Sequence, residues 1–162
     1  MCNSRISALT LVVTACGLCL LLSSCGGDSD TTSTVDALTK SEFIRQADEI
    51  CSETEKRQLF LVDEFQQKRR AEGETQPPSS QDETEIVKEA GLPPLERQIE
   101  ELSELPPPKT DSEQLAKYLQ ALEVAVKSAE KNPRSLLGRE SDPFAKATSL
   151  ASDFGFKVCS GA

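Results

Sequence analysis

The chain has 162 residues and a formal net charge of −9, with 27 acidic and 18 basic side chains and no histidine. A surface of this charge repels nucleic acid and anionic lipid headgroups, so we predict no nucleic-acid partner. The absence of histidine excludes Ser-His-Asp and Cys-His nucleophile systems and helical Glu-x-x-His metal sites. The sequence also lacks a glycine-rich phosphate loop. We therefore predict no catalytic residues, no metal site and no cofactor.

Residues 1–24 have the three parts of an export signal. Arg5 supplies positive charge, an apolar stretch of about 17 residues follows, and Leu22-Ser23-Ser24-Cys25 closes the segment. This ending resembles the bacterial lipobox, in which the cysteine thiol receives diacylglycerol and the peptide is cut just before that cysteine. We therefore predict a signal peptide over 1–24 and lipidation of Cys25. The alternative is an uncleaved transmembrane anchor, although a span needs about 20 apolar residues.

The lipobox resemblance implies a location as well as a modification. Acyl chains such as palmitate insert into the membrane, and each buried methylene contributes about 0.8 kcal/mol to anchoring. We expect the protein to be anchored by lipid at the extracytoplasmic face of the cell membrane. Residues 25–38 are then the lipidated cysteine and a flexible polar spacer, and residues 39–162 form a helical domain.

Six cysteines suggest a disulfide framework, but only two remain after the predicted processing. Three leave with the signal peptide: Cys2, Cys16 and Cys19. Since Cys25 carries lipid, Cys51 and Cys159 are left to face an oxidising compartment. We predict a disulfide between them that closes a loop of about 108 residues. The alternatives are two buried thiols or a reactive pair.

The first predicted helix spans residues 40–71. Thr39-Lys40-Ser41-Glu42 has the pattern of a capping box, and Leu38 and Phe43 lie at hydrophobic-staple positions. Apolar residues then recur at steps of three and four along one face, which we predict to be core: Phe43, Ala47, Ile50, Thr54, Leu61 and Phe65. We interpret Lys68-Arg69-Arg70 as a solvated basic turn that complements the helix dipole.

Four further helices are predicted, over 81–90, 93–105, 112–131 and 143–154. Their starts are marked by a capping box at Ser80–Glu83, by Pro93-Pro94, by Thr110 or Asp111, and by Asp142-Pro143. Gly91 and Gly155 follow the second and the last helix as C-cap residues. Because the second and third helices count as one element and no alternating strand pattern occurs, the sequence predicts an all-α bundle of about four helices, closed by one disulfide.

Two segments carry a family resemblance. The stretch from Leu38 to Cys51 contains F-I-x-x-A-D-x-I-C, and the stretch from Asp153 to Cys159 contains G-x-K-V-C. Both resemble segments of small, uncharacterised actinobacterial lipoproteins. The resemblance covers about 20 residues. It implies the same disulfide and an envelope location, and it implies no activity.

Acidic side chains are the remaining candidates for chemistry. Glu96, Glu100 and Glu104 lie four residues apart, with Glu101 beside them, and carboxylate pairs can cleave glycosides or bind calcium. Apolar residues occupy the opposite side of this helix, so we predict that these glutamates, like the other acids of the chain, point to solvent.

Function is therefore predicted only in broad terms. We expect a non-catalytic envelope module whose partner is a protein, a glycan or a small ligand. The alternatives are a carboxylate-using envelope enzyme, which requires an inward-facing acid pair in a cleft, and a purely structural or assembly factor.

Overall fold

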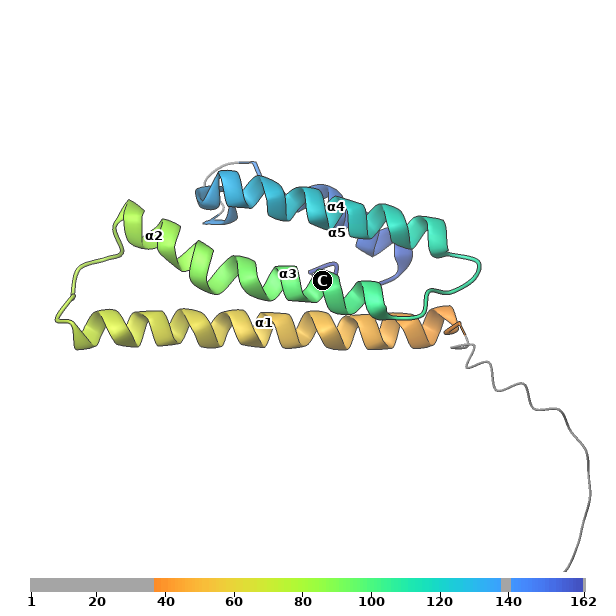
Figure 1. Ribbon diagram of the computed structural model, residues 1–162, viewed down its shortest axis with the longest axis horizontal. Helices are drawn as coiled ribbons and strands as arrows, with labels where there is room; N and C mark the ends of the chain where they lie inside the picture. Colours follow the sequence, from red (N-terminus) through yellow and green to blue (C-terminus); the bar gives the residue numbers. More distant parts are fainter. Residues whose placement is uncertain (1–36, 138–140, 162) are drawn as a thin grey trace, which may run out of the picture. The chain divides into compact units, whose positions relative to one another are not determined.

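The structure is a computed structural model that describes residues 37–137 and 141–161. This part of the protein consists of helices and the segments that connect them (Figure 1). These residues belong to one unit, Thr34–Ala162. In chain order the elements are α1 (Lys40–Ala71), α2 (Ser80–Ile86), the π-helical η1 (Val87–Gly91), α3 (Leu92–Glu104), α4 (Ser112–Lys131), the 3₁₀ turn η2 (Pro133–Leu137) and α5 (Ala145–Phe154). The predicted signal peptide, Cys25 and most of the predicted spacer lie outside the described residues.

The helices pack as a bundle in which successive long elements run antiparallel (Figure 1). The longest, α1, packs on α3 and η1; α3 packs on α4, and α4 packs on α5. The described ranges contain no strand. A disulfide joins Cys51 of α1 to Cys159 after α5, so the chain end returns to the first helix. The predicted all-α bundle closed by one disulfide is confirmed.

Local sequence signals place several helix ends correctly. The Thr39 hydroxyl accepts the Glu42 N–H at 3.3 Å, and the Glu42 carboxylate accepts the Thr39 N–H at 3.1 Å, which completes the predicted capping box. At the end of the last helix, Gly155 has φ +105°. The N–H of Phe156 donates to the carbonyl of Ala151 at 3.1 Å, so α5 ends in the predicted Schellman motif.

Three predicted boundaries are wrong in detail. The second capping box is built on Ser79 and Asp82, so α2 begins one residue earlier than predicted. Gly91 does not end a helix, because η1 carries the backbone continuously into α3. The Asp142 carboxylate accepts the Phe144 N–H at 2.8 Å, yet α5 begins only at Ala145, so the predicted start at 143 is two residues early.

The basic turn at the end of α1 is also different from its prediction. Lys68 and Arg70 are exposed, whereas Arg69 is 8% exposed. The Arg69 guanidinium bonds the Glu74 carboxylate at 2.9 Å and approaches the Asp82 carboxylate at 3.2 Å. Arg69 therefore joins the end of α1 to the start of α2, because a guanidinium with two carboxylate partners can be buried at low cost.

Aromatic residues form the centre of the core. Phe43 of α1 meets Phe154 edge-to-face, with ring centroids 5.9 Å apart, and Phe156 lies between Phe154 and Tyr118 at 4.6 and 5.2 Å. All four rings are at most 4% exposed. Because these rings come from α1, α4, α5 and the segment after α5, one cluster holds both ends of the domain together.

The environment of Tyr118 predicts how the stability of the protein depends on pH. Its hydroxyl is buried and has no hydrogen-bond partner among the described residues. Burial, with a smaller contribution from the charge of Asp48, raises the pKa of this hydroxyl well above its ordinary value. The unfolded phenol ionises near pH 10, at about its ordinary pKa, but the folded one stays protonated, so stability falls as pH rises above about 10.

We therefore expect Tyr118→Phe to unfold at a higher pH than the unchanged protein, with neutral-pH stability equal or higher by about 1 kcal/mol. Tyr118 is the only tyrosine of the chain, and there is no tryptophan. Tyrosinate absorbance should consequently rise together with the loss of far-ultraviolet circular dichroism during alkaline titration. Ionisation of Tyr118 well before unfolding would contradict the buried environment.

Candidate functional site

The two cysteines left by the predicted processing lie together in the fold. Cys51 is in the third to fourth turn of α1 and is 3% exposed, and its Cα lies 5.3 Å from that of Cys159. The predicted disulfide is confirmed, and the alternatives of separate buried thiols or a reactive pair are not. The bond reaches the segment after α5, while α5 itself packs chiefly on α4.

Asp48 lies one turn before Cys51 and binds the same chain end. Its carboxylate accepts the N–H of Lys157, Val158 and Cys159 at 3.0–3.2 Å. Three successive N–H groups around one carboxylate form an anion-binding nest. We call Asp48, the disulfide and residues 157–159 the terminal clasp.

The terminal clasp explains why two distant segments of the sequence belong together. Asp48 lies in the N-terminal segment that carries the family resemblance, and its three donors lie in the C-terminal one. The prediction that every acid faces solvent is wrong here, because this carboxylate is partly buried against backbone donors. No local pattern marks such a residue, since its partners are more than 100 positions away along the chain.

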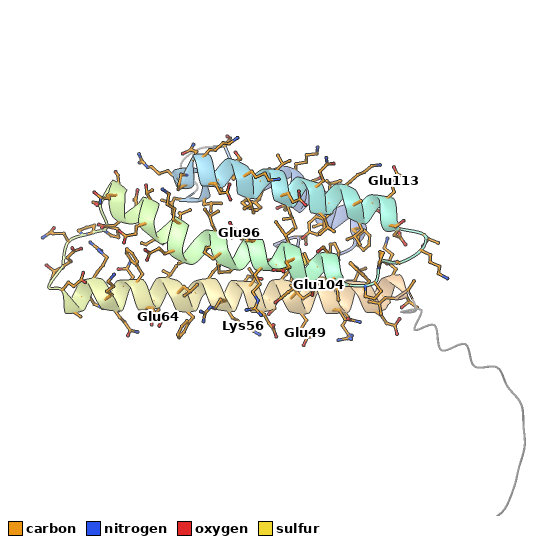
Figure 2. All side chains as sticks on the ribbon, in the orientation of Figure 1. Glu49, Lys56, Glu64, Glu96, Glu104 and Glu113 are labelled. Atoms are coloured by element: carbon orange, nitrogen blue, oxygen red, sulfur yellow. A yellow bond between two sulfur atoms is a disulfide. The ribbon has the colours of Figure 1, made fainter. Side chains whose placement is uncertain are left out.

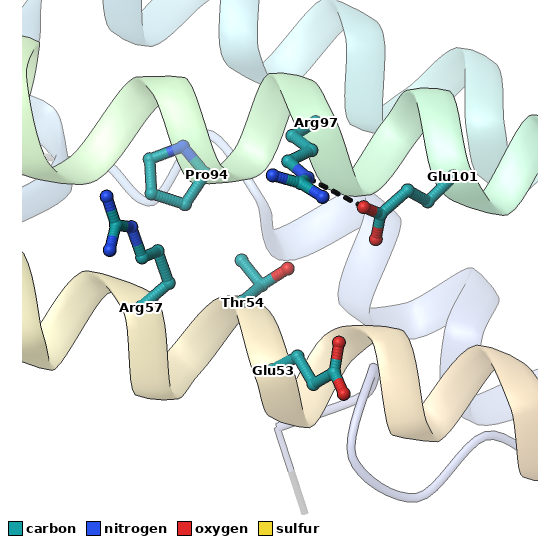
Figure 3. Close-up of a pocket in the computed structure, with 6 residues that line it drawn as sticks. All are labelled: Glu53, Thr54, Arg57, Pro94, Arg97 and Glu101. Carbon is teal, nitrogen blue, oxygen red and sulfur yellow. Dashed lines mark hydrogen bonds and ion pairs between the residues drawn. The ribbon is translucent and has the colours of Figure 1, made fainter. Parts of the chain in front are cut away.

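A shallow polar groove lies between α1 and α3. Figure 3 shows Arg57 and Pro94 at one end and Glu53 and Glu101 at the other, with Thr54 and Arg97 between them. The hollow has a volume of about 250 Å³. Thr54 and Pro94 are buried and form its floor, while the charged side chains rise at its rim.

Each wall of the groove carries one arginine and one glutamate. The Arg97 guanidinium donates to the Glu101 carboxylate at 2.7 Å, and this hydrogen bond, with the negative charges of Glu101, Glu100 and Glu53, raises the pKa of Arg97. The Arg57 guanidinium lies 5.4 Å from the Phe60 ring centroid. Arg57 makes no ion pair within the described ranges, so its guanidinium donors face the hollow without a carboxylate partner.

The groove can bind a polar ligand with at least one anionic group. Guanidinium groups recognise carboxylates and phosphates through paired hydrogen bonds, and the carboxylates at the other end suit hydroxyl or amino groups. Its volume is just below the usual range for small-molecule sites, about 300–1,000 Å³. The groove was not predicted from the sequence. Charged residues on one face of a helix are interpreted as exposed to solvent when the neighbouring helix is unknown.

The predicted glutamate cluster lies on the outside of α3. Glu96, Glu100 and Glu104 are exposed, as predicted, and Figure 2 labels the first and last of them. Glu101 differs, because it lines the groove and pairs with Arg97. Residues 37–137 and 141–161 contain no group of three or more acidic, cysteine or histidine side chains arranged to hold a metal ion.

Comparison with protein-family models, with curated protein sequences and with solved structures yields no match to this chain. Within the described residues, no helix has both the length and the apolar character that a membrane crossing requires.

Proposed function

We propose that the chain is an extracytoplasmic lipoprotein, anchored through lipid on Cys25, whose helical domain is a non-catalytic binding module of the cell envelope. The disulfide supports the location, because such bonds form and persist in oxidising compartments outside the cytosol. The leader supports it independently, since Leu22-Ser23-Ser24-Cys25 follows an apolar stretch in the manner of a lipobox.

The groove between α1 and α3 is the observation that carries the binding role. It places two guanidinium groups from different helices over a buried floor, and the terminal clasp fixes α1 one turn away. A rigid frame with charged groups at its rim lowers the entropy lost on binding. Its ligand is an envelope protein, a glycan or a small molecule that presents a carboxylate or a phosphate.

The anchor is tested by Cys25→Ala. We expect this variant to appear in the medium or to accumulate as an uncut precursor, because no thiol remains to receive the lipid. Fractionation of cells, with mass spectrometry of the N-terminus, distinguishes the two. Processed variant protein that stays with the membrane would contradict lipidation of Cys25.

The binding role is tested by photo-cross-linking in intact cells. A photoreactive amino acid at position 53 lies at the rim of the groove, and one at position 113, exposed near the start of α4, serves as the control site. We expect covalent cross-links to a ligand from position 53 only. Arg97→Gln should reduce them about tenfold or more, since a charge-assisted hydrogen bond contributes about 1.5–3 kcal/mol.

The matched control for Arg97→Gln is Lys117→Gln. Both cations are exposed and pair with a glutamate one helical turn away. Equal loss in both variants would show a general effect of charge, and equal labelling from positions 53 and 113 would show that the groove is not the site.

A further inference from the structure

The face of α1 that points away from the bundle carries exposed apolar residues. The core side of α1 is buried at Phe43, Ala47, Cys51, Thr54, Phe65 and Arg69. On the outer side Leu59 is 72% and Phe60 52% exposed. Figure 2 shows Glu49, Lys56 and Glu64 along the same outer edge, with no helix of the described residues over it. Large apolar side chains at the middle of an open helix face mark a contact surface.

The charges around Leu59 and Phe60 follow a regular pattern. Glu49, Lys56, Asp63 and Arg70 recur at steps of seven residues, which keeps them in one row on the helix, and their signs alternate. All four side chains are exposed. Arg70 lies 3.9 Å from Asp63 within the same helix, a loose pair between two groups that are both about 60% exposed.

This row is centred on the point between Leu59 and Phe60. Glu53 and Arg57 do not belong to it, because they line the groove between α1 and α3. We call the row of Glu49, Lys56, Asp63 and Arg70 with these two apolar residues the outer stripe.

We propose that the outer stripe binds the outer stripe of a second copy of this chain, with the two α1 helices antiparallel. A two-fold axis between Leu59 and Phe60 brings Lys56 opposite Asp63 of the other copy and Glu49 opposite Arg70. The apolar residues then meet each other at the axis, so the surface is complementary to itself.

The sign pattern selects this arrangement over the parallel one. Two α1 helices that run parallel in register place every charge of the row against its own kind, which is unfavourable. The antiparallel arrangement pairs opposite charges at each position instead. Exposed ion pairs contribute little affinity but fix register and partner, while Leu59 and Phe60 supply the apolar contact.

The contact is short and therefore weak between free molecules. The row spans residues 49–70, which is about 33 Å of helix at a rise of about 1.5 Å per residue. Copies confined to one membrane surface, as the proposed lipid anchor implies, meet at a much higher effective concentration. The pairing itself requires only the outer stripe, so it can be tested separately from the anchor.

The test uses two differently tagged full-length chains expressed in one cell, followed by carbodiimide coupling of carboxylates to amines. We expect recovery of one tag to bring the other with it, with Lys56 joined to Asp63 of the other copy. E49K should reduce this product about fivefold or more, because two opposite-charge contacts become like-charge contacts while Lys56 and Asp63 remain available for coupling. R70E should do the same. Coexpression of E49K with R70E should restore the product, because opposite charges then face each other between the two variants.

The matched controls are E113K and K127E, which change the net charge equally at exposed positions of α4 and should leave the product unchanged. Circular dichroism and a thiol assay verify that each variant folds with its disulfide intact, and fractionation scores membrane retention separately. Equal product from E49K and the unchanged chain, failure of the coexpressed pair to recover the product, or coupling that joins α1 helices in parallel register would each overturn the proposal.

Discussion

Removal of the disulfide by Cys51→Ala/Cys159→Ala is expected to lower the free energy of unfolding by about 2–5 kcal/mol. The bond closes a loop between residues 108 positions apart, and a loop of this size restricts the unfolded chain strongly. A domain of this size has only about 5–15 kcal/mol of net stability. The melting temperature should therefore fall by about 8–20 °C.

Helical content at low temperature should remain nearly unchanged in this variant. The contacts of α1 with α3 and of α3 with α4 do not depend on the bond. The loss of stability is therefore concentrated in the chain end and α5. Far-ultraviolet circular dichroism, melting curves and amide hydrogen exchange test these statements. Reductant should shift the melting curve of the unchanged protein and not that of the variant. If the two proteins melt at the same temperature, the bond adds nothing to the stability of the fold.

Features encoded by adjacent residues could be predicted well from the sequence. The capping box at Thr39 and Glu42 depends on side chains three positions apart, and the Schellman ending at Gly155 depends on a residue that tolerates positive φ. The disulfide could be predicted by elimination, because the predicted export and lipidation would leave only Cys51 and Cys159. Ser79 and Ser80 are both good N-caps, so the start of α2 could not be assigned to one of them from sequence alone.

Features that depend on distant residues could not be predicted. Helix continues through Gly91, where the Gln58 side chain of α1 donates to the Gly91 carbonyl at 2.9 Å. Arg69 is buried because α2 brings Asp82 to it, although the basic run alone favours a solvated turn. The groove has the same origin, since Arg57 and Arg97 become neighbours only when α1 and α3 pack. In each case the tertiary contact overrides a correct local tendency.

The chain end shows how one charged residue can close the fold. The Lys40 ammonium of α1 donates to the Asp111 carboxylate at 2.9 Å and lies 4.5 Å from the Phe154 ring centroid. This contact ties the start of α1 to the start of α4 and the end of α5. Asp48, two turns further along α1, then receives the backbone that follows Phe156. The two groups lie two turns apart on the same helix, so α1 is the frame on which the rest of the bundle closes.

Asp48→Ala is accordingly expected to lower the free energy of unfolding by about 2–4 kcal/mol, because hydrogen bonds to a charged acceptor are the stronger ones and three N–H groups lose theirs. Chemical denaturation monitored by circular dichroism measures this loss. Asp48→Asn keeps an oxygen acceptor without the charge and should lose about half as much. Asp153→Ala, at an exposed position of α5, is the matched control and should change stability by less than about 0.5 kcal/mol.

The two parts of the terminal clasp should also depend on each other. With the disulfide intact, residues 157–159 are already held beside Asp48, so the carboxylate gains its three donors at little entropic cost. Without the bond, the same contacts must first order a free chain end. Asp48→Ala should therefore cost at least about 1 kcal/mol less in the Cys51→Ala/Cys159→Ala background than in the unchanged protein. Additive losses in this double-mutant cycle would show that Asp48 and the disulfide hold the chain end independently, and that the clasp does not act as one unit.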